Sequence, residues 1–340
     1  MLLPIALSTL FGRFRLSLGL ASLFAAGPVI AQEAADPLTK ACPAYDAAEY
    51  AAALELPEQD YSPSPAMWKI ADGDTVIHLF GTVHLLPEGF KWRTPALDAV
   101  IERADKVVFE TRDSDDGDEA MKGLEMMRLR ALVQIYGPTT PLTEQLTAEN
   151  RAKFLQLLDI YEIKQMTADR LPPFLTMLLI AQKSSERSGS MRELGVETVI
   201  EREFKAAGKP IIAIEDQLDV LEKLFKIGEE RTIEIVNASI AEWDVCEEMD
   251  PQAVDWTAEQ QWARGELTPD VLDELRDDPF GRAVYDILLT QRNEAWAQWI
   301  ESRLETPGSL LIAVGAGHMV GETSLLRLLA DKGIVATRVQ

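Results

Sequence analysis

Two histidines of this chain each follow a strand-like apolar run in the same local frame. One lies in HLFGTVHLLP (78–87) and the other in LIAVGAGHMVG (311–321), and each has a glycine three residues before it. The chain holds three histidines in all. The third, His78, sits inside the first run without such a glycine, so we interpret it as structural. In open α/β sheets, ligands collect beyond the carboxyl ends of strands. The spacing therefore predicts that His84 and His318 meet in one site.

Glycines explain how backbone could approach such a site. Gly81 and Gly315 each stand three residues before a histidine, and Gly317 lies directly before His318. A glycine at a strand end permits a sharp turn or a close approach to a ligand. Histidine there supplies a metal ligand or a base that works near neutral pH. The alternative is that His84 and His318 are strand-end residues whose rings bond to backbone carbonyls.

Acidic residues at strand ends could complete a mixed nitrogen and oxygen site. Glu110 ends KVVFE and Glu215 ends PIIAIE. A carboxylate at the tip of a buried strand costs several kcal/mol unless it is paired or bound to a cation. The combination with histidine suits Zn, Mn, Co or Fe(II). Glu197, in ELGVET, is a weaker candidate because it can simply begin a helix. Glu110 and Glu215 could equally cap helices or pair with arginine.

A polar pair lies on a helix whose other residues form an apolar stripe. Arg292 and Asn293 occur in QRNEAWAQWI. The arginine could bind a carboxylate or an anionic intermediate, and the asparagine could fix its geometry. An ion pair on a packed helix is an equal alternative.

The elements that must position these residues come from both ends of the chain. We predict a helix over 94–104, with Thr94 as its N-cap and Pro95 at its first position. Asp-Gly between the first two strands predicts a hairpin. Strands are predicted at 67–73, 75–84, 106–111, 210–215, 309–318 and 334–339. Between them the sequence is mostly helical. This order favours an α/β fold with a large helical insertion in one sheet core, because the closing strands should pair with the opening ones.

The first residues have the features of an export signal. Residues 1–31 carry Arg13 and Arg15, then an apolar run that ends in small residues, which predicts a signal peptide cut near Ala31–Gln32. An uncleaved anchor is the alternative. A lead-in segment (32–65) and one catalytic domain (66–340) would follow, exported to the periplasm or secreted. After cleavage we expect no stable membrane span, because no later run reaches ~18 unbroken apolar residues.

Charge and cysteine content narrow the possible partners. Loss of the two signal arginines takes the formal charge from −23 to −25. Such a surface repels phosphate backbones, so we expect no nucleic acid as a partner. Cys42 and Cys246 are the two cysteines. In an oxidising compartment an even pair predicts one disulfide, with two unrelated thiols as the alternative.

Several of these motifs together resemble the TraB/GumN (PrgY) family, which is related to the Tiki proteases and more distantly to erythromycin-esterase-like proteins. The resemblance covers about 66–340. Its carriers are LFGTVHLLP (79–87), VVFET (107–111), ELGVET (193–198), IIAIED (211–216), RN (292–293) and AVGAGHMVG (313–321). Two positions depart from the family pattern. Glu197 stands where many members have Asp, and the strand before Glu215 lacks the usual Gly-Leu-Glu-Thr ending.

The resemblance implies an EreA/ChaN-like core and, through Tiki, a metal-dependent hydrolase of peptide bonds that favours Mn or Co. In that reading His84, Glu110 and His318 hold the ion or activate water, and Arg292 and Asn293 steady the oxyanion. Two alternatives stay open. One is a periplasmic binding protein that captures a metal, haem or peptide without chemistry, and the other is a metal-free esterase with His84 as base.

Overall fold

A computed structural model describes residues 47–56, 58–111, 119–267, 276 and 279–340. The predicted signal peptide (1–31) and Cys42 lie outside these ranges. In chain order the elements of the first half are α2 (Ala47–Ala53), β1 (Met67–Ala71), β2 (Thr75–Thr82), β3 (Leu86–Pro87), α3 (Pro95–Arg103), β4 (Lys106–Phe109), α4 (Glu119–Tyr136), α5 (Leu142–Gln145), α6 (Ala148–Ile160), α7 (Gln165–Ala168) and α8 (Pro173–Arg187). The remaining elements are β5 (Ser190–Met191), η2 (Arg192–Leu194), α9 (Val196–Ala206), β6 (Ile211–Ala213), α10 (Gln217–Phe225), α11 (Glu229–Glu242), α12 (Val245–Glu248), η3 (Pro251–Ala253), α13 (Thr257–Ala263), α15 (Pro279–Tyr285), η5 (Asp286–Thr290), α16 (Gln291–Arg303), β7 (Gly308–Gly315), η6 (Ala316–Met319), α17 (Leu325–Asp331) and β8 (Thr337–Arg338).

One mixed sheet, built from both ends of the chain, forms the centre of the fold. Its strand order is β6-β4-β7-β2-β1-β8. The last long strand, β7, pairs in parallel with β2 and β4, and β4 pairs in parallel with β6. β1 runs antiparallel to β2 across the predicted Asp-Gly hairpin, and β8 closes the sheet against β1. The expected pairing of opening and closing strands is confirmed, as is the α/β class.

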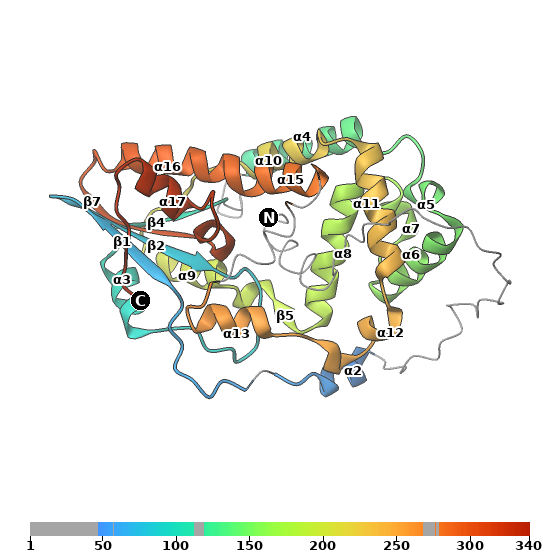
Figure 1. The fold of residues 1–340 in the computed structure, drawn as a ribbon, viewed down its shortest axis with the longest axis horizontal. Coiled ribbons are helices and arrows are strands. Elements are labelled where there is room, and N and C mark those ends of the chain that lie inside the picture. The colour runs from blue at the N-terminus through green and yellow to red at the C-terminus, as the bar shows by residue number, and fades with distance from the viewer. Residues whose placement is uncertain (1–46, 57, 112–118, 268–275, 277–278) are drawn as a thin grey trace, which may run out of the picture.

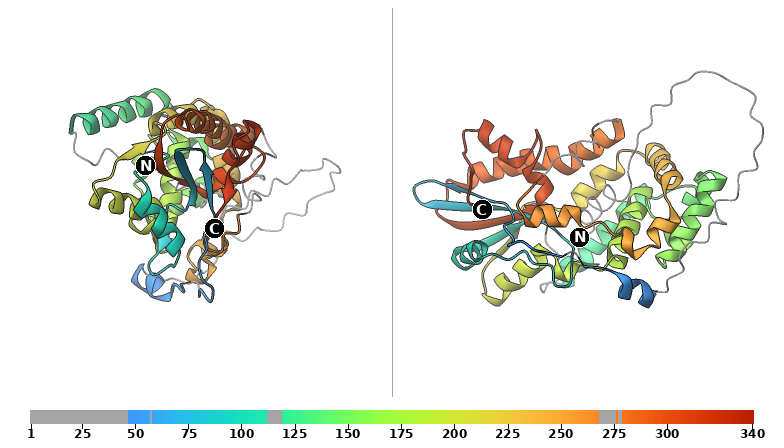
Figure 2. Two further views of the ribbon diagram at one scale, coloured as in Figure 1. Left: turned by 90° about the vertical axis from the view of Figure 1, so that its left-hand side faces the viewer. Right: turned by 60° about the horizontal axis from the view of Figure 1, so that its bottom comes forward.

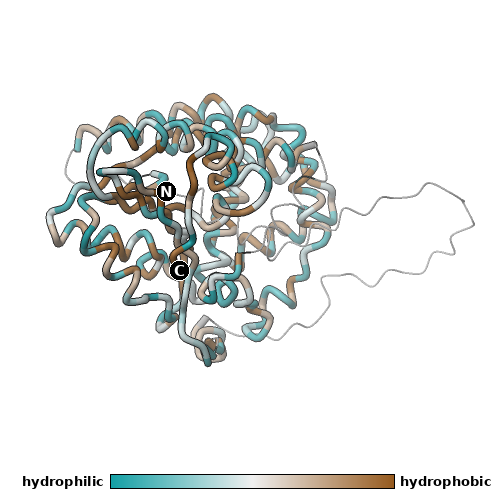
Figure 3. The backbone as a smooth tube through the Cα atoms, turned by 60° about the vertical axis from the view of Figure 1, so that its left-hand side comes forward, coloured by the Kyte–Doolittle hydropathy of each residue, from teal (hydrophilic) through white to brown (hydrophobic). Residues whose placement is uncertain are grey.

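Helices cover both faces of this sheet. α3 and α9 pack on one face, with Leu97, Ile200 and Phe204 in the shared core. α16 and α17 pack on the other, through Trp296, Ile300 and Leu329. Figure 1 shows these layers, and in Figure 3 the hydrophobic tube of the strands runs inside a shell of mixed helices. The side chains of each strand point alternately to the two faces of the sheet. Because helices cover both faces, the strand sequences are apolar nearly throughout.

The helical insertion forms a second packed region beyond the carboxyl ends of the parallel strands (Figure 1). It has two hydrophobic clusters, one centred on Phe154 and Leu157 of α6 and the other on Leu178 of α8 with Leu224 of α10. Within the described residues, none of the helices combines the length and apolar character needed to cross a bilayer.

Local signals placed several element ends correctly. Thr94 caps α3 by accepting the Leu97 N–H, and Pro95 is the first residue of that helix. Other ends differ. The strand predicted to reach residue 84 stops at Thr82. The strand predicted over 309–318 ends at Gly315, because the chain turns into η6 there, and the strand predicted over 334–339 is limited to Thr337–Arg338.

The predicted lead-in segment is tied to both regions from residue 47 onward. Tyr50 of α2 is buried, and the Arg187 guanidinium lies 4.1 Å from its ring. The Trp256 indole N–H donates to the Glu55 carbonyl. The chain then enters β1, so this segment links the helical insertion to the sheet.

Candidate functional site

The predicted site residues follow the carboxyl ends of parallel strands. His84 comes two residues after β2, Glu110 directly after β4, and Glu215 two residues after β6. His318 lies in η6, the 3-10 turn that follows β7. The parallel register places Thr82 beside Gly315, and Phe109 beside Ala313. All four side chains therefore leave the same edge of the sheet.

Gly315 marks the point where three of these side chains meet. A Cβ at Gly315 would lie 3.1 Å from Glu110 Oε1, 3.3 Å from His84 Nε2 and 3.8 Å from His318 Cδ2. The Gly315 N–H donates to Glu110 Oε1 at 2.6 Å. Any larger residue at 315 would fill the space between the two imidazoles and the carboxylate. The expected meeting of His84 and His318 is confirmed.

The other two glycines of the motifs play different parts. A Cβ at Gly81 would lie 3.1 Å from the Ala316 Cα, so Gly81 lets η6 pack against the end of β2. Gly317 lies inside η6. His78 is paired with Leu311 in the middle of β2 and does not reach the cluster.

His84 is oriented by a carboxylate that the sequence marked only as a secondary candidate. Its Nδ1 lies 2.7 Å from Glu197 Oε1. Glu197, in the first turn of α9, also accepts the Thr82 hydroxyl, and its Oε2 is buried without a partner among the described residues. This pairing leaves His84 Nε2 directed at Gly315.

Gly195 allows the start of α9 to pack closely against the loop that carries His84. A Cβ at Gly195 would lie 1.9 Å from the His84 carbonyl oxygen. The next N–H, of Val196, donates to the Val83 carbonyl at 3.0 Å. Sequence reasoning missed Gly195 and Thr82, although a glycine just before a predicted helix was the available signal.

His318 is oriented by Asn293. Its Nδ1 lies 2.7 Å from Asn293 Oδ1, and Asn293 Nδ2 donates to the Thr323 carbonyl at 2.8 Å. Since that bond identifies the amide oxygen as the acceptor, His318 Nδ1 carries the proton and its Nε2 has a free lone pair. That Nε2 lies 3.6 Å from Glu110 Oε1. Asn293 thus holds the ring of His318, and its predicted role toward an oxyanion stays a prediction.

Arg292 is held between two carboxylates. Its Nη2 donates to Glu110 Oε2 and Glu215 Oε1, both at 2.5 Å, and its Nε donates to Glu215 at 2.8 Å. Its Nη1 donates to the Leu288 carbonyl in η5, a π-helical segment, and such segments are frequent at functional sites. The ion-pair alternative describes the observed contacts, while a role toward an oxyanion stays a prediction.

Burial and these partners set the charges of the cluster. Burial would raise the pKa of Glu110, but Arg292 and the two histidines lower it to about 2. Burial and the nearby Arg292 guanidinium lower the pKa of His318 to about 3. Burial also lowers the pKa of His84, but Glu197 outweighs it, so the net shift is upward. The pKa values of the two imidazoles are therefore shifted in opposite directions, and His318 is neutral near neutral pH.

Glu215 forms its ion pair with Arg292 and not with either histidine of the cluster. Burial raises its pKa, and the adjacent Arg292 offsets this only in part. The expected strand-end carboxylate is therefore present at the sheet edge, and its observed partner is a guanidinium.

The donor types of this cluster fit a divalent ion, although their spacing is not that of a closed ligand set. No three His, Cys, Asp or Glu side chains within the described ranges are arranged to hold a metal ion. Metal-binding histidines usually donate their second ring N–H to a carboxylate or carbonyl, as His84 and His318 do. The 3.6 Å between His318 Nε2 and Glu110 Oε1 approaches the ~3.4 Å expected for two atoms bound to one tetrahedral ion. Ion binding itself stays a prediction.

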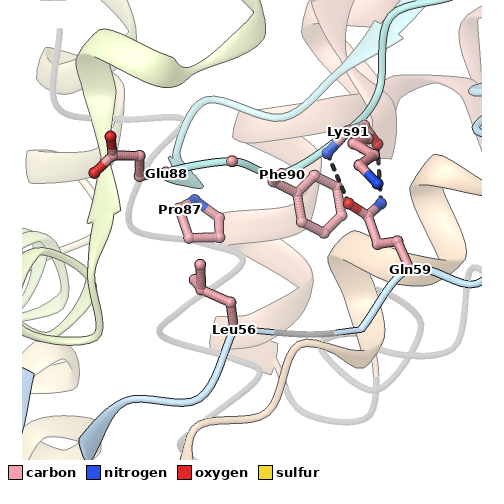
Figure 4. Close-up of a pocket in the computed structure, with 7 residues that line it drawn as sticks. Leu56, Gln59, Pro87, Glu88, Phe90 and Lys91 are labelled. Atoms are coloured by element: carbon pink, nitrogen blue, oxygen red, sulfur yellow. Dashed lines mark hydrogen bonds between the residues drawn. The ribbon is translucent and has the colours of Figure 1, made fainter. Parts of the chain in front are cut away.

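A small cavity lies next to the first histidine motif in sequence. It has a volume of about 190 Å³. Its walls are Leu56, Gln59, Pro87, Glu88, Gly89, Phe90 and Lys91 (Figure 4). The Gln59 amide donates to the Lys91 carbonyl and accepts the Lys91 N–H, which fixes the turn after β3 against the lead-in segment. These walls combine apolar side chains with polar and charged groups at 59, 88 and 91, and the volume suits one side chain of a ligand.

Only one of the two cysteines of the predicted disulfide lies in the described residues. Cys246 lies in α12, and no free cysteine occurs in the described part of the chain. Because Cys42 falls outside those ranges, the Cys42–Cys246 bridge stays a prediction.

Comparisons with known proteins agree with the motifs. The sequence model of the TraB/PrgY/gumN family matches residues 66–338. The uncharacterized protein YbaP of Escherichia coli K12 is 21% identical over 266 residues, which is 78% of this chain and 92% of that protein. YbaP of Shigella flexneri matches with the same identity and coverage. No solved structure gives a significant match. On the extent of the family match, this chain belongs to the TraB/PrgY/gumN family.

Proposed function

We propose that this chain is an exported metal-dependent hydrolase, similar to the Tiki peptidases, whose site is built from the two Gly-x-x-His motifs. One observation carries the proposal. Two imidazoles, each fixed through Nδ1 by its own partner, direct their other edges at a shared point beside Glu110 and Gly315.

His84, Glu110 and His318 would hold the ion, with Mn, Co or Zn as the candidates. A bound divalent ion supplies a water of lowered pKa as nucleophile near neutral pH. Neutral imidazole and carboxylate together suit these metals.

The surrounding residues keep the donors in the right form. Arg292 keeps Glu110 ionised, so its carboxylate remains an acceptor at any pH near neutrality. Glu197 and Asn293 fix the ring orientations of His84 and His318, and such partners also raise the basicity of a ligand. Removing either partner should weaken the site without removing a donor.

The substrate we propose is a peptide or a small acyl compound. The cavity at Pro87 and Phe90 begins three residues after His84, a span of at most ~11 Å of extended chain. A peptide that reacts beside His84 could place a neighbouring apolar side chain there. The acidic surface disfavours strongly anionic substrates.

A metal-free hydrolase is the second candidate, and one observation favours it. The pKa of His84 is shifted upward and that of His318 downward, to about 3, and such divergence is the usual arrangement of a general acid and a general base. In this case His84, which the sequence suggested as the base, would instead give a proton to the leaving group, and His318 would take one from water.

Metal analysis with matched variants distinguishes these candidates. Protein purified without chelator should retain about one divalent ion, and cobalt-loaded protein should show visible absorption that is lost in His84→Ala and His318→Ala. His78→Ala is the control and should keep both metal and turnover. Peptide hydrolysis that survives complete metal removal would support the metal-free route. Retained metal or peptide without turnover of any peptide or ester would leave only a binding protein.

Export is a separate part of the proposal and has its own test. The N-terminal pattern predicts that the mature protein begins near Gln32. N-terminal sequencing of periplasmic protein checks this. A full-length chain in the membrane fraction would contradict it.

A further inference from the structure

Helix α4 carries two apolar faces, and the body of the protein covers only one of them. Leu132 is its single buried residue, and all of the helix lies within the described ranges. Leu129, Val133 and Tyr136 are partly buried against the α8 and α10 cluster. In the left view of Figure 2, α4 projects from the body at the upper left.

The uncovered face has the spacing of a helix-packing surface. Its seam consists of Ala120, Leu124, Met127, Ala131 and Ile135, which are all exposed. Leu124 is 47% exposed, Met127 62% and Ile135 68%. The intervals of four, three and four residues keep the first four on one side of the helix, as in a coiled-coil seam. Packing, rather than helix propensity, supplies most of the stability of such helices, and the exposed side chains of Leu124, Met127 and Ile135 leave apolar surface available for it.

The order of large and small residues in this seam is self-complementary. If two copies of α4 pack antiparallel with a twofold axis between positions 127 and 128, Ala120 faces Ile135 of the second copy. Leu124 then faces Ala131, and Met127 lies beside its own counterpart. Large residues meet small ones, which is how helix surfaces interdigitate without voids. A twofold contact requires this kind of self-complementary patch.

We propose that two copies of this chain associate through α4, with their seams packed antiparallel about a twofold axis beside Met127.

Charge on this helix favours a second copy over a membrane surface. Arg128 lies near the seam, but its guanidinium is turned to Asp216 and Asp219 of the same chain, at 2.6 and 2.9 Å. Lys122 pairs with Glu119. The sequence just before the helix is acidic, with four aspartates in residues 113–118. Membrane-surface helices instead carry lysine and arginine along the polar face, which attract anionic lipid.

The area involved indicates a reversible dimer. An 18-residue helix is ~27 Å long, and a face ~10 Å wide gives ~300 Å² per copy, well under the ~800 Å² per partner of a standard interface. Both copies carry the same negative charge, so salt should screen their repulsion and strengthen the pairing. Electrostatically driven association would show the opposite salt dependence.

Analytical ultracentrifugation of the purified protein over a concentration series tests the proposal. We expect a monomer–dimer equilibrium that shifts toward dimer as salt rises. Met127→Glu should weaken association at least tenfold, because it places a charge at the axis. Met126→Glu is the matched control, since Met126 is 50% exposed but lies outside the seam. A monomer at every concentration, or equal loss in both variants, would overturn the proposal.

Site-directed cross-linking gives an independent readout. Met127→Cys should link to its counterpart with a short bismaleimide, whereas Met126→Cys should not. Circular dichroism of all four variants establishes that the fold is retained. If the protein stays monomeric but sediments with vesicles of anionic lipid, and Met127→Glu abolishes this sedimentation, the seam binds membrane and the dimer is rejected.

Discussion

Glu197 and His84 form a buried pair in which the carboxylate Oε1 lies 2.7 Å from the ring Nδ1. The pair joins the first turn of α9 to the loop after β2. It decides which edge of the His84 ring faces Glu110, and it raises the pKa of a buried imidazole that burial alone would lower.

Replacing this carboxylate tests its effect directly. In Glu197→Gln an amide oxygen can still accept the Nδ1 proton, but the charge is gone, so the pKa of His84 should fall. With three histidines in the chain, NMR titration of the ring signals can follow each one. The signals of His318 and His78 serve as internal controls. An unchanged His84 titration would show that Glu197 does not hold its proton.

Glu110 should give the metal-free protein a characteristic loss of stability in acid. Its pKa is lowered from 4.5 to about 2, so the folded state gains stability that is complete above pH 4.5 and is lost as the pH falls toward 2. A shift of this size is worth about 3 kcal/mol. In Glu110→Gln this contribution is absent, so its free energy of unfolding should differ most from wild type near neutrality. The two curves should converge near pH 2.

Urea unfolding between pH 2 and 7, with chelator present, measures this difference. Glu119→Gln, at an exposed ion pair with Lys122, is the control and should run parallel to wild type. A constant gap between wild type and Glu110→Gln at every pH would contradict the assignment.

Gly195 should tolerate no side chain. The Cβ of Gly195→Ala would lie 1.9 Å from the His84 carbonyl oxygen, a backbone atom that can move only with the loop. We expect a loss of about 2–3 kcal/mol and displacement of His84 from Gly315. Gly73→Ala is the control, because a Cβ there meets nothing within 4 Å. Thermal unfolding and metal retention are the measurements, and full retention of both in Gly195→Ala would refute the contact.

The predicted disulfide can be tested on native protein. Non-reducing peptide mapping should find Cys42 joined to Cys246, and reduction should cost about 2–4 kcal/mol because the closed loop is long. Cys246→Ser should give the same loss without reductant. Two free thiols in the native protein would reject the bridge.

The sequence by itself determined the local features of this protein. The Thr94 and Pro95 helix start, the Asp-Gly hairpin and the apolar strands depend on residues close together in the chain, so their patterns were legible without a structure. The strand-end positions of His84, Glu110 and His318 followed from the same patterns. Parallel pairing then sufficed to predict that they meet.

Only the tertiary structure decided what each polar group bonds to. Arg292, on α16, pairs with Glu110 and Glu215, which follow the strands β4 and β6. His84 pairs with Glu197, on a helix 113 positions further along the chain. Burial at these points makes an unpaired charge costly, so each group takes the nearest complementary partner that the fold provides. Which partner that is depends on strand order and helix placement rather than on sequence spacing, and for this reason Glu197 and Gly195 became visible only once α9 was placed against β2.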